Sequence, residues 1–206
     1  IVTTLVSLAA IAAAAVAPAQ VPQSERDALL SLYDATAGAG WTDRTGWGGA
    51  AGTECQWYGV ECHEPDGVVH VGALWLGDNH LVGQIPGSIG ALRRLVVLAL
   101  WGNELTGQLP AALGTITSLE YLQLADNQLS GELPEWLGGI DGLKVLDLWG
   151  NELSGELPAW LGGMSRLEQL YLDGNRFTGP IPPELGDLAS LQSLFLGGNL
   201  FTGSIP

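Results

Sequence analysis

Positive charge is scarce in this sequence. Seven Lys and Arg residues stand against 22 Asp and Glu residues, which gives a formal net charge of -15 at pH 7. A molecule with this balance repels phosphate backbones and anionic lipid headgroups at long range. We therefore expect no nucleic-acid partner, and contact with a membrane only through an anchor beyond Pro206.

Long apolar runs are confined to the start of the chain. Residues 1–19 are almost entirely small and apolar, and they end in Ala and Pro residues that suit a cleavage site. The pattern is typical of a secretory signal peptide, here without an initiating Met or a basic n-region. A transmembrane anchor is the alternative, since the length is close to the ~20 residues that span a bilayer. We expect cleavage, so that the mature protein is secreted or lies at the cell surface.

Cysteine is also rare, with Cys55 and Cys62 as the only two copies. In an exported chain, a pair this close in sequence is most simply a disulfide. A metal site is the alternative, because His63 and His70 lie nearby and could complete a Cys2His2 set. That spacing matches no common zinc pattern, so we expect a disulfide and no metal.

Catalytic motifs are missing as well. The three His residues lie in or beside the N-terminal third, and the sequence has no Gly-x-Ser-x-Gly, His-Glu-x-x-His or phosphate-binding loop. Carboxylates are plentiful, but no pattern fixes two of them at a catalytic distance. We expect neither enzymatic activity nor a cofactor.

The sequence does contain a repeat of 24 residues. One Asn recurs at this interval, inside a frame of the type Leu-x-x-Leu-x-Leu-x-x-Asn-x-Leu-x-Gly-x-Leu-Pro. The Leu-x-Leu alternation predicts a short strand in each copy, and copies must stack because one copy cannot bury its leucines alone. The copies begin at Val71, Leu95, Leu119, Leu143, Leu167 and Leu191.

The Asn column is predicted to be structural. Its side chains can satisfy backbone groups that tight turns leave unpaired, within a repeat and in its neighbour. The six residues are Asn79, Asn103, Asn127, Asn151, Asn175 and Asn199.

With its Leu-(Ser/Thr)-Gly-x-(Ile/Leu)-Pro segment, the frame resembles the plant-type leucine-rich repeat over residues 71–206. The resemblance implies an inner parallel sheet, short helical or 3₁₀ segments on the convex side and a second small sheet. The expected fold class is an α/β leucine-rich-repeat solenoid of six 24-residue repeats with a helical N-terminal cap. Because the sixth copy stops at Pro206 without a polar cap, we expect a fragment of a longer protein.

Residues 20–70 are expected to form that cap. Ser24 is predicted to cap a helix with Glu25 in its first turn. The segment from Cys55 to Cys62 resembles the closing segment of plant-type caps, which implies a disulfide between these two residues. The apolar helix positions are Ala28, Leu29, Leu32 and Tyr33, and the expected cap core contains Trp41, Trp47 and Trp57.

Positions between the inward-facing leucines are predicted to line the concave surface. Two repeats separate Trp101 from Trp149, so the indoles should lie roughly 10 Å apart and form a slot over the small Ala125. Exposed aromatics beside fixed polar groups suit a binding surface, although strands favour aromatics in any case. The predicted ligand-binding residues are Trp75, Trp101, Tyr121, Gln123, Asp147, Trp149, Tyr171 and Asp173, with Asp126 at the rim and Phe195 in the same strand-centre column.

Two further columns have structural interpretations. Trp136 and Trp160 occupy equal places in adjacent copies and are expected to stack as packing on the convex or lateral side. A hydroxyl column is expected to serve the second sheet, with templating of ordered water or ice as the alternative. Its members are Thr106, Ser130, Ser154, Thr178 and Thr202.

The resemblance implies recognition, because plant-type repeats of this kind form ectodomains of receptor kinases, receptor-like proteins and polygalacturonase inhibitors. We expect an extracellular module that binds a protein, peptide or oligosaccharide on its concave face, with the ectodomain of a receptor-like protein in signalling as one form of it. The alternatives are a structural or adhesive wall or surface protein and a wall-enzyme inhibitor. The sequence has no N-glycosylation site, which departs from secreted plant members. Its Ala- and Gly-rich, Lys-poor composition is compatible with a bacterial or algal source.

Overall fold

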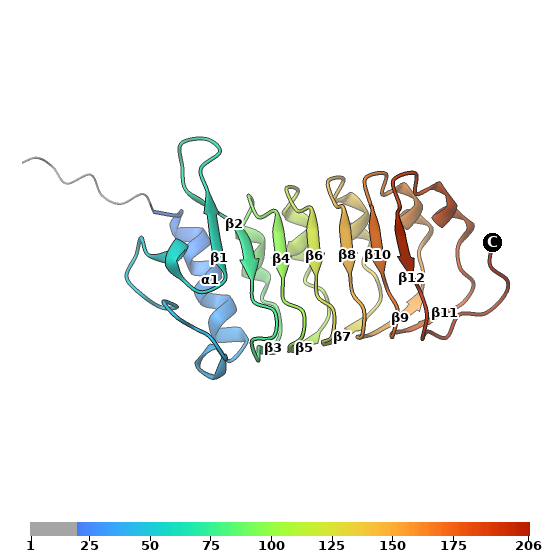
Figure 1. Ribbon diagram of the computed structural model, residues 1–206, viewed down its shortest axis with the longest axis horizontal. Helices are drawn as coiled ribbons and strands as arrows, with labels where there is room; N and C mark the ends of the chain where they lie inside the picture. The colour runs from blue at the N-terminus through green and yellow to red at the C-terminus, as the bar shows by residue number, and fades with distance from the viewer. Residues whose placement is uncertain (1–19) are drawn as a thin grey trace, which may run out of the picture.

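The computed structural model describes residues 20–206, and the predicted signal peptide in residues 1–19 lies outside them. The described chain is an elongated stack with an N-terminal cap at one end (Figure 1). Within it, no helix has both the length and the apolar composition needed to cross a bilayer.

The main sheet runs the length of the stack. In residues 20–206 it has seven strands in the order β1-β2-β4-β6-β8-β10-β12. β1 pairs antiparallel with β2, and every later pair is parallel and joins residues 24 positions apart, such as Leu98 with Leu122. The strands are β1 Val60–His63, β2 His70–Trp75, β4 Val97–Ala99, β6 Tyr121–Gln123, β8 Val145–Asp147, β10 Gln169–Tyr171 and β12 Ser193–Phe195.

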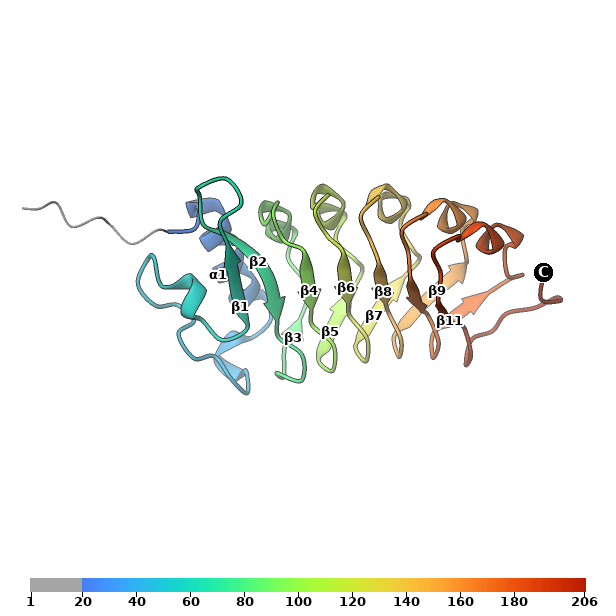
Figure 2. The ribbon, with the colours of Figure 1, turned by 45° about the horizontal axis from the view of Figure 1, so that its top comes forward.

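A second parallel sheet forms from the Leu-x-Gly part of the repeats (Figure 2). Among the described residues it has five strands in the order β11-β9-β7-β5-β3. The strands are β3 Val82–Gly83, β5 Glu104–Gly107, β7 Gln128–Gly131, β9 Glu152–Glu156 and β11 Arg176–Thr178. This arrangement confirms the parallel solenoid that the repeat predicted.

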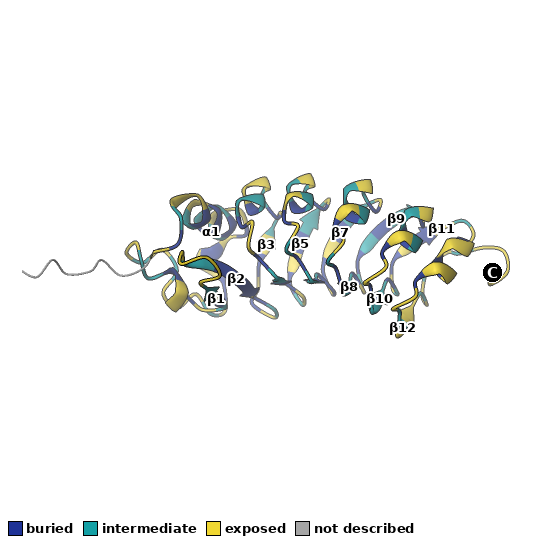
Figure 3. Ribbon diagram, turned by 90° about the horizontal axis from the view of Figure 1, so that it is seen from above, coloured by how far each residue is buried: buried dark blue, intermediate teal, exposed yellow. Residues whose placement is uncertain are grey.

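Short 3₁₀ helices form the opposite side of the stack. Each follows a proline, whose fixed φ suits the entry to a turn, and each buries one aliphatic side chain, as Leu113 does after Pro110. Figure 3 shows exposed and half-exposed residues along these turns and buried residues in the strands beneath, except in the exposed terminal strand β12. The segments are η3 Gly87–Ala91, η4 Ala111–Thr115, η5 Glu135–Gly139, η6 Ala159–Gly163 and η7 Pro183–Asp187.

The Asn side chains join neighbouring repeats. Asn127 Nδ2 donates to the carbonyls of Leu100, Leu124 and Ala125 at 3.0, 3.2 and 3.0 Å, and its Oδ1 accepts from the Leu105 amide at 2.9 Å. Buried backbone groups that the three-residue strands leave open are thereby satisfied. The same three-carbonyl pattern recurs at Asn103, Asn151, Asn175 and Asn199.

Asn79 differs because it lies where the repeats meet the cap. Its Nδ2 donates to the Asp43 carbonyl at 2.9 Å, and its Oδ1 accepts from the Asp43 amide at 2.6 Å. The first Asn of the column therefore fixes a cap loop to the solenoid.

The cap helix α1 spans Gln23–Ala35, and its start corrects one sequence prediction. Its N-cap is Pro22, whose carbonyl accepts hydrogen bonds from the amides of Glu25 and Arg26, so Ser24 lies inside the helix and caps nothing. The chain enters the helix early because Val21 is buried in the core.

Aromatic rings fill the cap beneath this helix. Trp41 and Trp57 are buried, Trp47 is half-buried, and each ring contacts another in the set. Tyr33 stacks on Trp47 with ring centroids 5.9 Å apart. Trp41 and Trp57 belong to the same apolar core as Val71 and Leu74 of the first repeat, as expected for the end of a solenoid. Two short 3₁₀ segments, η1 Gly38–Gly40 and η2 Glu54–Gln56, complete the cap.

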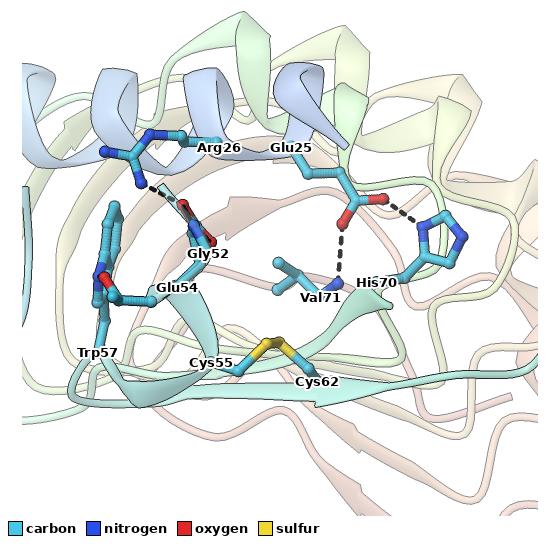
Figure 4. Close-up of a disulfide and its surroundings, with 10 residues drawn as sticks. Glu25, Arg26, Gly52, Glu54, Cys55, Trp57, Cys62, His70 and Val71 are labelled. Carbon is cyan, nitrogen blue, oxygen red and sulfur yellow. Dashed lines mark hydrogen bonds and ion pairs between the residues drawn. A yellow bond between two sulfur atoms is a disulfide. The ribbon is translucent and has the colours of Figure 1, made fainter. Parts of the chain in front are cut away.

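The disulfide between Cys55 and Cys62 is confirmed, with Cα atoms 5.6 Å apart (Figure 4). It joins η2 to β1. The alternative zinc site is thereby excluded, because both sulfurs are bonded and His70 pairs with Glu25 instead. In residues 20–206 no group of three or more His, Cys, Asp or Glu residues is arranged to hold a metal ion.

Candidate functional site on the concave sheet

The strand register places the predicted binding residues in columns across the main sheet. Trp75 pairs with Ala99, Gln123 with Asp147, and Tyr171 with Phe195. Trp101 and Trp149 follow β4 and β8 on the same face of the stack. Four aromatic side chains of this face remain exposed by 42, 41, 46 and 53%, namely Trp75, Trp101, Trp149 and Phe195.

A pocket of about 300 Å³ lies over strands β8, β10 and β12. It brings together four predicted residues from two adjacent repeats and adds Phe195 from the next strand. Tyr171 and Phe195 form its far wall, with ring centroids 5.2 Å apart. The lining residues are Asp147, Trp149, Tyr171, Asp173 and Phe195.

Asp147 is one of two half-buried acids in this pocket, beside Asp173. Its Oδ1 accepts a hydrogen bond of 3.3 Å from the Trp149 amide, a long contact that stabilises the carboxylate weakly. Burial, and to a smaller degree the charge of Asp173, raise the pKa of Asp147 above its ordinary value. The pocket therefore holds a carboxylate that water and the chain stabilise poorly.

Trp101 lies away from this pocket. Its indole covers Gly77 in the preceding repeat so closely that a Cβ on Gly77 would come within 2.4 Å of the ring. Trp149 instead has its indole nitrogen near the following turn, 3.6 Å from the position of a Cβ on Gly174. The two indoles of the predicted slot thus lean toward opposite ends of the stack.

The remaining predicted residues lie nearer the cap. Tyr121 is half-buried, and the Nζ of Lys144 lies 6.0 Å from its ring centroid. Gln123 is half-buried between Ala99 and Asp147 in the strand-centre column. Trp75 lines a separate pocket of about 370 Å³ with residues 58–61 of the cap.

Asp126 lies in the turn after β6 and has a φ of 51°. Gly150, at the equivalent position of the next repeat, has a φ of 66°. Asp tolerates this left-handed conformation better than most residues. Asp126 is exposed and lies outside the Trp149 pocket.

Phe195 was placed on this face by the sequence but was not among the predicted binding residues. The available signal was its place in the same column as Asp147 and Tyr171. Its contribution depends on the tilt of the ring toward Tyr171, which the repeat frame does not specify.

The lateral side of the stack contains a larger pocket of about 740 Å³. It is lined by Gln108, residues 131–135, Ser154 and Trp160. Trp160 packs over Gly138, as Trp136 packs over Gly114 in the preceding copy. Each indole thus covers a glycine of the repeat before it, and the two rings form no aromatic pair among the described residues, contrary to the expected stack.

The hydroxyl column lies on the second sheet. Thr106 and Thr178 donate to carbonyls of the preceding strand, those of Gly83 and Gly155, at 3.1 and 3.3 Å. These bonds support the strand pairing that the sequence assigned to this column.

Comparison with known proteins agrees with this geometry. A family model described as Leucine rich repeat matches residues 117–177 and 141–201. No curated protein matches the chain significantly. Several solved structures do match, at identities above a quarter.

The crystal structure of PEPR1–AtPEP1 is 34% identical, with a TM-score of 0.79, over 90% of this chain and 26% of that one. The ectodomain of the Arabidopsis receptor kinase HAESA, in complex with a peptide hormone ligand, is 32% identical, with a TM-score of 0.73, over 88% and 30%. A plant ice-binding protein is 29% identical, with a TM-score of 0.80, over 88% and 58%. The chain thus spans less than two thirds of each of these relatives.

The repeat frame, the parallel sheets and these matches define the class as a leucine-rich-repeat solenoid. The family model and the solved structures to which the chain is similar support a plant-type leucine-rich-repeat protein. The resemblance predicted from the sequence is confirmed.

Proposed function

We propose that this chain is an extracellular, non-catalytic recognition module that binds a peptide or a segment of a protein along its concave sheet. The observation that carries the proposal is the pocket around Trp149. A rigid, hydrogen-bonded sheet that keeps aromatic rings exposed beside fixed carboxylates supplies contact area and direction at little entropy cost. The predicted binding residues, from Trp75 to Asp173, form the proposed contact surface.

Three further features support the proposal. The HAESA ectodomain, which shares this fold, was solved with a peptide hormone. The disulfide of Cys55 and Cys62 suits an oxidising, extracellular compartment. The apolar leader in residues 1–19 is typical of a secreted protein.

The test is selection of a displayed random-peptide library on the purified protein. Bound peptides are then measured against Trp149→Ala, against Trp101→Ala, and against Trp160→Ala as a control on the lateral side. Truncation of a central aromatic contact should weaken binding about tenfold or more. The Trp160→Ala protein should bind as the wild type does.

Recovery of no peptide, or equal binding by the wild type and the Trp149→Ala protein, would contradict the proposal. Loss of peptide binding only in the Trp160→Ala protein would identify the lateral pocket as the binding site. Unchanged circular dichroism of each variant excludes loss of fold as the cause.

A second candidate function is ice binding, which the similarity to a plant ice-binding protein favours. The hydroxyl column of the second sheet is the proposed surface, although Thr106 and Thr178 already donate to backbone carbonyls. The test is inhibition of ice recrystallisation by the wild type and by Ser154→Tyr. Activity that Ser154→Tyr loses and Trp149→Ala keeps would support this candidate, and an inactive wild type would end it.

A further inference from the structure

The pocket around Trp149 offers a ligand mainly hydrogen-bond acceptors and ring faces. Asp147 and Asp173 accept and cannot donate while they are ionised. The Tyr171 hydroxyl donates to Gln169 Oε1 at 3.3 Å, a long hydrogen bond that directs its proton to a partner within the chain. The indole nitrogen of Trp149 lies against the neighbouring turn. A group that only donates is therefore complementary to this lining.

Charge favours the same kind of group. In the described part of the chain the ion pairs engage other acids, and neither Asp147 nor Asp173 takes part in one. Burial and the neighbouring Asp173 charge raise the pKa of Asp147, which means that its ionised form is held at a cost. A cation between the two carboxylates would offset that cost.

The protein holds its own cations in settings of this type. Arg26 pairs with Glu54 and places its guanidinium carbon 5.2 Å from the centroid of the Trp57 ring. Lys144 Nζ lies 2.7 Å from a glutamate oxygen of the preceding repeat and 6.0 Å from the centroid of the Tyr121 ring. A carboxylate beside an aromatic face is therefore an established cation site in this chain, because the ring quadrupole and the anion attract together.

Size limits the occupant further. A pocket of about 300 Å³ is at the lower end of the range for small-molecule sites, which suits one side chain better than a whole ligand. Its acceptors and rings suit a planar guanidinium, which donates to two oxygens and stacks on aromatic faces.

We infer that the pocket of Asp147, Trp149, Tyr171, Asp173 and Phe195 binds one cationic side chain of a peptide on the concave sheet, with arginine preferred over lysine. This inference rests on the proposed function and specifies the ligand chemistry of the same site. A divalent metal is a poorer occupant, because Ca²⁺ takes about six to eight oxygen ligands and the rings supply none.

The experiment uses two pentapeptides, acetyl-Gly-Gly-Xaa-Gly-Gly-amide, with Xaa either arginine or its neutral isostere citrulline. Binding is followed by the indole N–H resonance of Trp149, which is assigned by its absence in Trp149→Phe. The arginine peptide should shift this resonance saturably and bind about tenfold more tightly than the citrulline peptide.

Two carboxamide variants test the acids. Asp147→Asn and Asp173→Asn should each weaken arginine-peptide binding about fivefold or more and leave citrulline-peptide binding unchanged. Asp187→Asn is the matched control, because it removes one negative charge from an exposed position on η7. It should bind as the wild type does, which separates a local contact from a change in net charge.

Equal shifts by the two peptides, no shift by either, or equal weakening by Asp187→Asn would overturn the cation assignment. The proposed function survives that result if library peptides without a basic residue still need Trp149. Binding of a neutral oligosaccharide that requires Trp149 and is unchanged by Asp147→Asn would also overturn the assignment. The pocket would then be a sugar-binding site. Failure of every concave-face ligand would contradict the proposed function itself.

Discussion

The cap and the Trp149 pocket use the same residue types for opposite purposes. In the cap, Glu25, Glu54 and the rings of Trp41 and Trp57 are buried, and both carboxylates have partners within the chain. In the pocket, acids and rings of the same kinds are left half-exposed and without an internal cation. The difference fits a cap whose acids and rings contribute stability and a pocket that, as proposed above, binds an external partner.

The two buried acids of the cap, Glu25 and Glu54, have hydrogen-bond or ion-pair partners within the chain. Glu25 accepts from the Val71 amide at 2.8 Å and contacts His70 Nδ1 at 2.6 Å (Figure 4). Glu54 pairs with Arg26 and accepts from the Gly52 amide at 3.0 Å. These contacts link α1 to β2 and to the loop before η2, so the cap behaves as one packed unit.

Removal of one indole from the cap and of one from the Trp149 pocket should give the largest difference in loss of stability. Trp57→Ala deletes a side chain that is 2% exposed and should lower the free energy of unfolding by about 4 kcal/mol. Trp149→Ala deletes a side chain that is 46% exposed and should cost less than about 1 kcal/mol. Guanidinium unfolding of both variants measures the contrast, and similar losses would show that Trp149 is a packing residue.

Loss of a buried acid from the cap should have the next largest effect. Glu54→Ala leaves Arg26, whose side chain is 14% exposed, without its carboxylate and should cost about 3 kcal/mol. Glu64→Ala is the control, because Glu64 is an exposed cap residue, and it should change stability by about 0.5 kcal/mol or less. Urea unfolding compares the two, and a Glu54→Ala protein as stable as its control would contradict the role of the pair.

Removal of the disulfide should cost less, because the loop that it closes is short. With a sequence separation of 7, replacement of Cys55 and Cys62 by Ala should lower stability by about 2 kcal/mol. The concave pocket lies several repeats away, so peptide binding by the folded variant should be unchanged. Binding measured below the unfolding transition checks this independence, and a weakened affinity would show that the cap acts on the site.

Asp147→Asn should change stability least of these variants, and it should raise the free energy of unfolding where the others lower it. Because the pKa of Asp147 is raised above its ordinary value of 3.8, the folded state binds more protons than the unfolded state in the window just above that value. Stability contributed by this group therefore falls as pH rises through the window, and the loss persists at neutral pH.

The Asn variant should accordingly be slightly more stable than the wild type at pH 7 and equal to it near pH 3. Melting temperatures at both pH values measure the difference. Relative to the wild type, Asp187→Asn should not raise the melting temperature at pH 7 more than at pH 3. A destabilised Asp147→Asn protein at pH 7 would mean that the carboxylate has a favourable partner.

Much of the fold was predictable because the same residue pattern, and with it the same local backbone conformation, recurs in each repeat. The period-two leucines, the prolines before the 3₁₀ turns and the Asn column each specify a backbone conformation through local chemistry. The start of α1 was not predictable in this way. Ser24 is a good N-cap residue, but burial of Val21 and the fixed φ of Pro22 moved the helix start toward the N-terminus.

The site was predictable in part. The register of a regular solenoid follows from its period, so the column that contains Asp147, Tyr171 and Phe195 could be derived from spacing alone. The directions of the indoles could not, because rotamers depend on which neighbouring repeat offers space. Gly77 leaves room for Trp101 to fold toward the cap, whereas Trp149 lies toward the turn at Gly174.

By itself, the sequence determined the parallel solenoid, the disulfide and the face on which aromatic and acidic residues gather, because these follow from period, pairing chemistry and side-chain alternation. The second sheet was expected from the family resemblance. Only the tertiary structure decided which of those residues share a pocket, which carboxylates have a cation and which do not. Those features depend on packing between repeats, where the size of one neighbouring residue determines the direction of a ring.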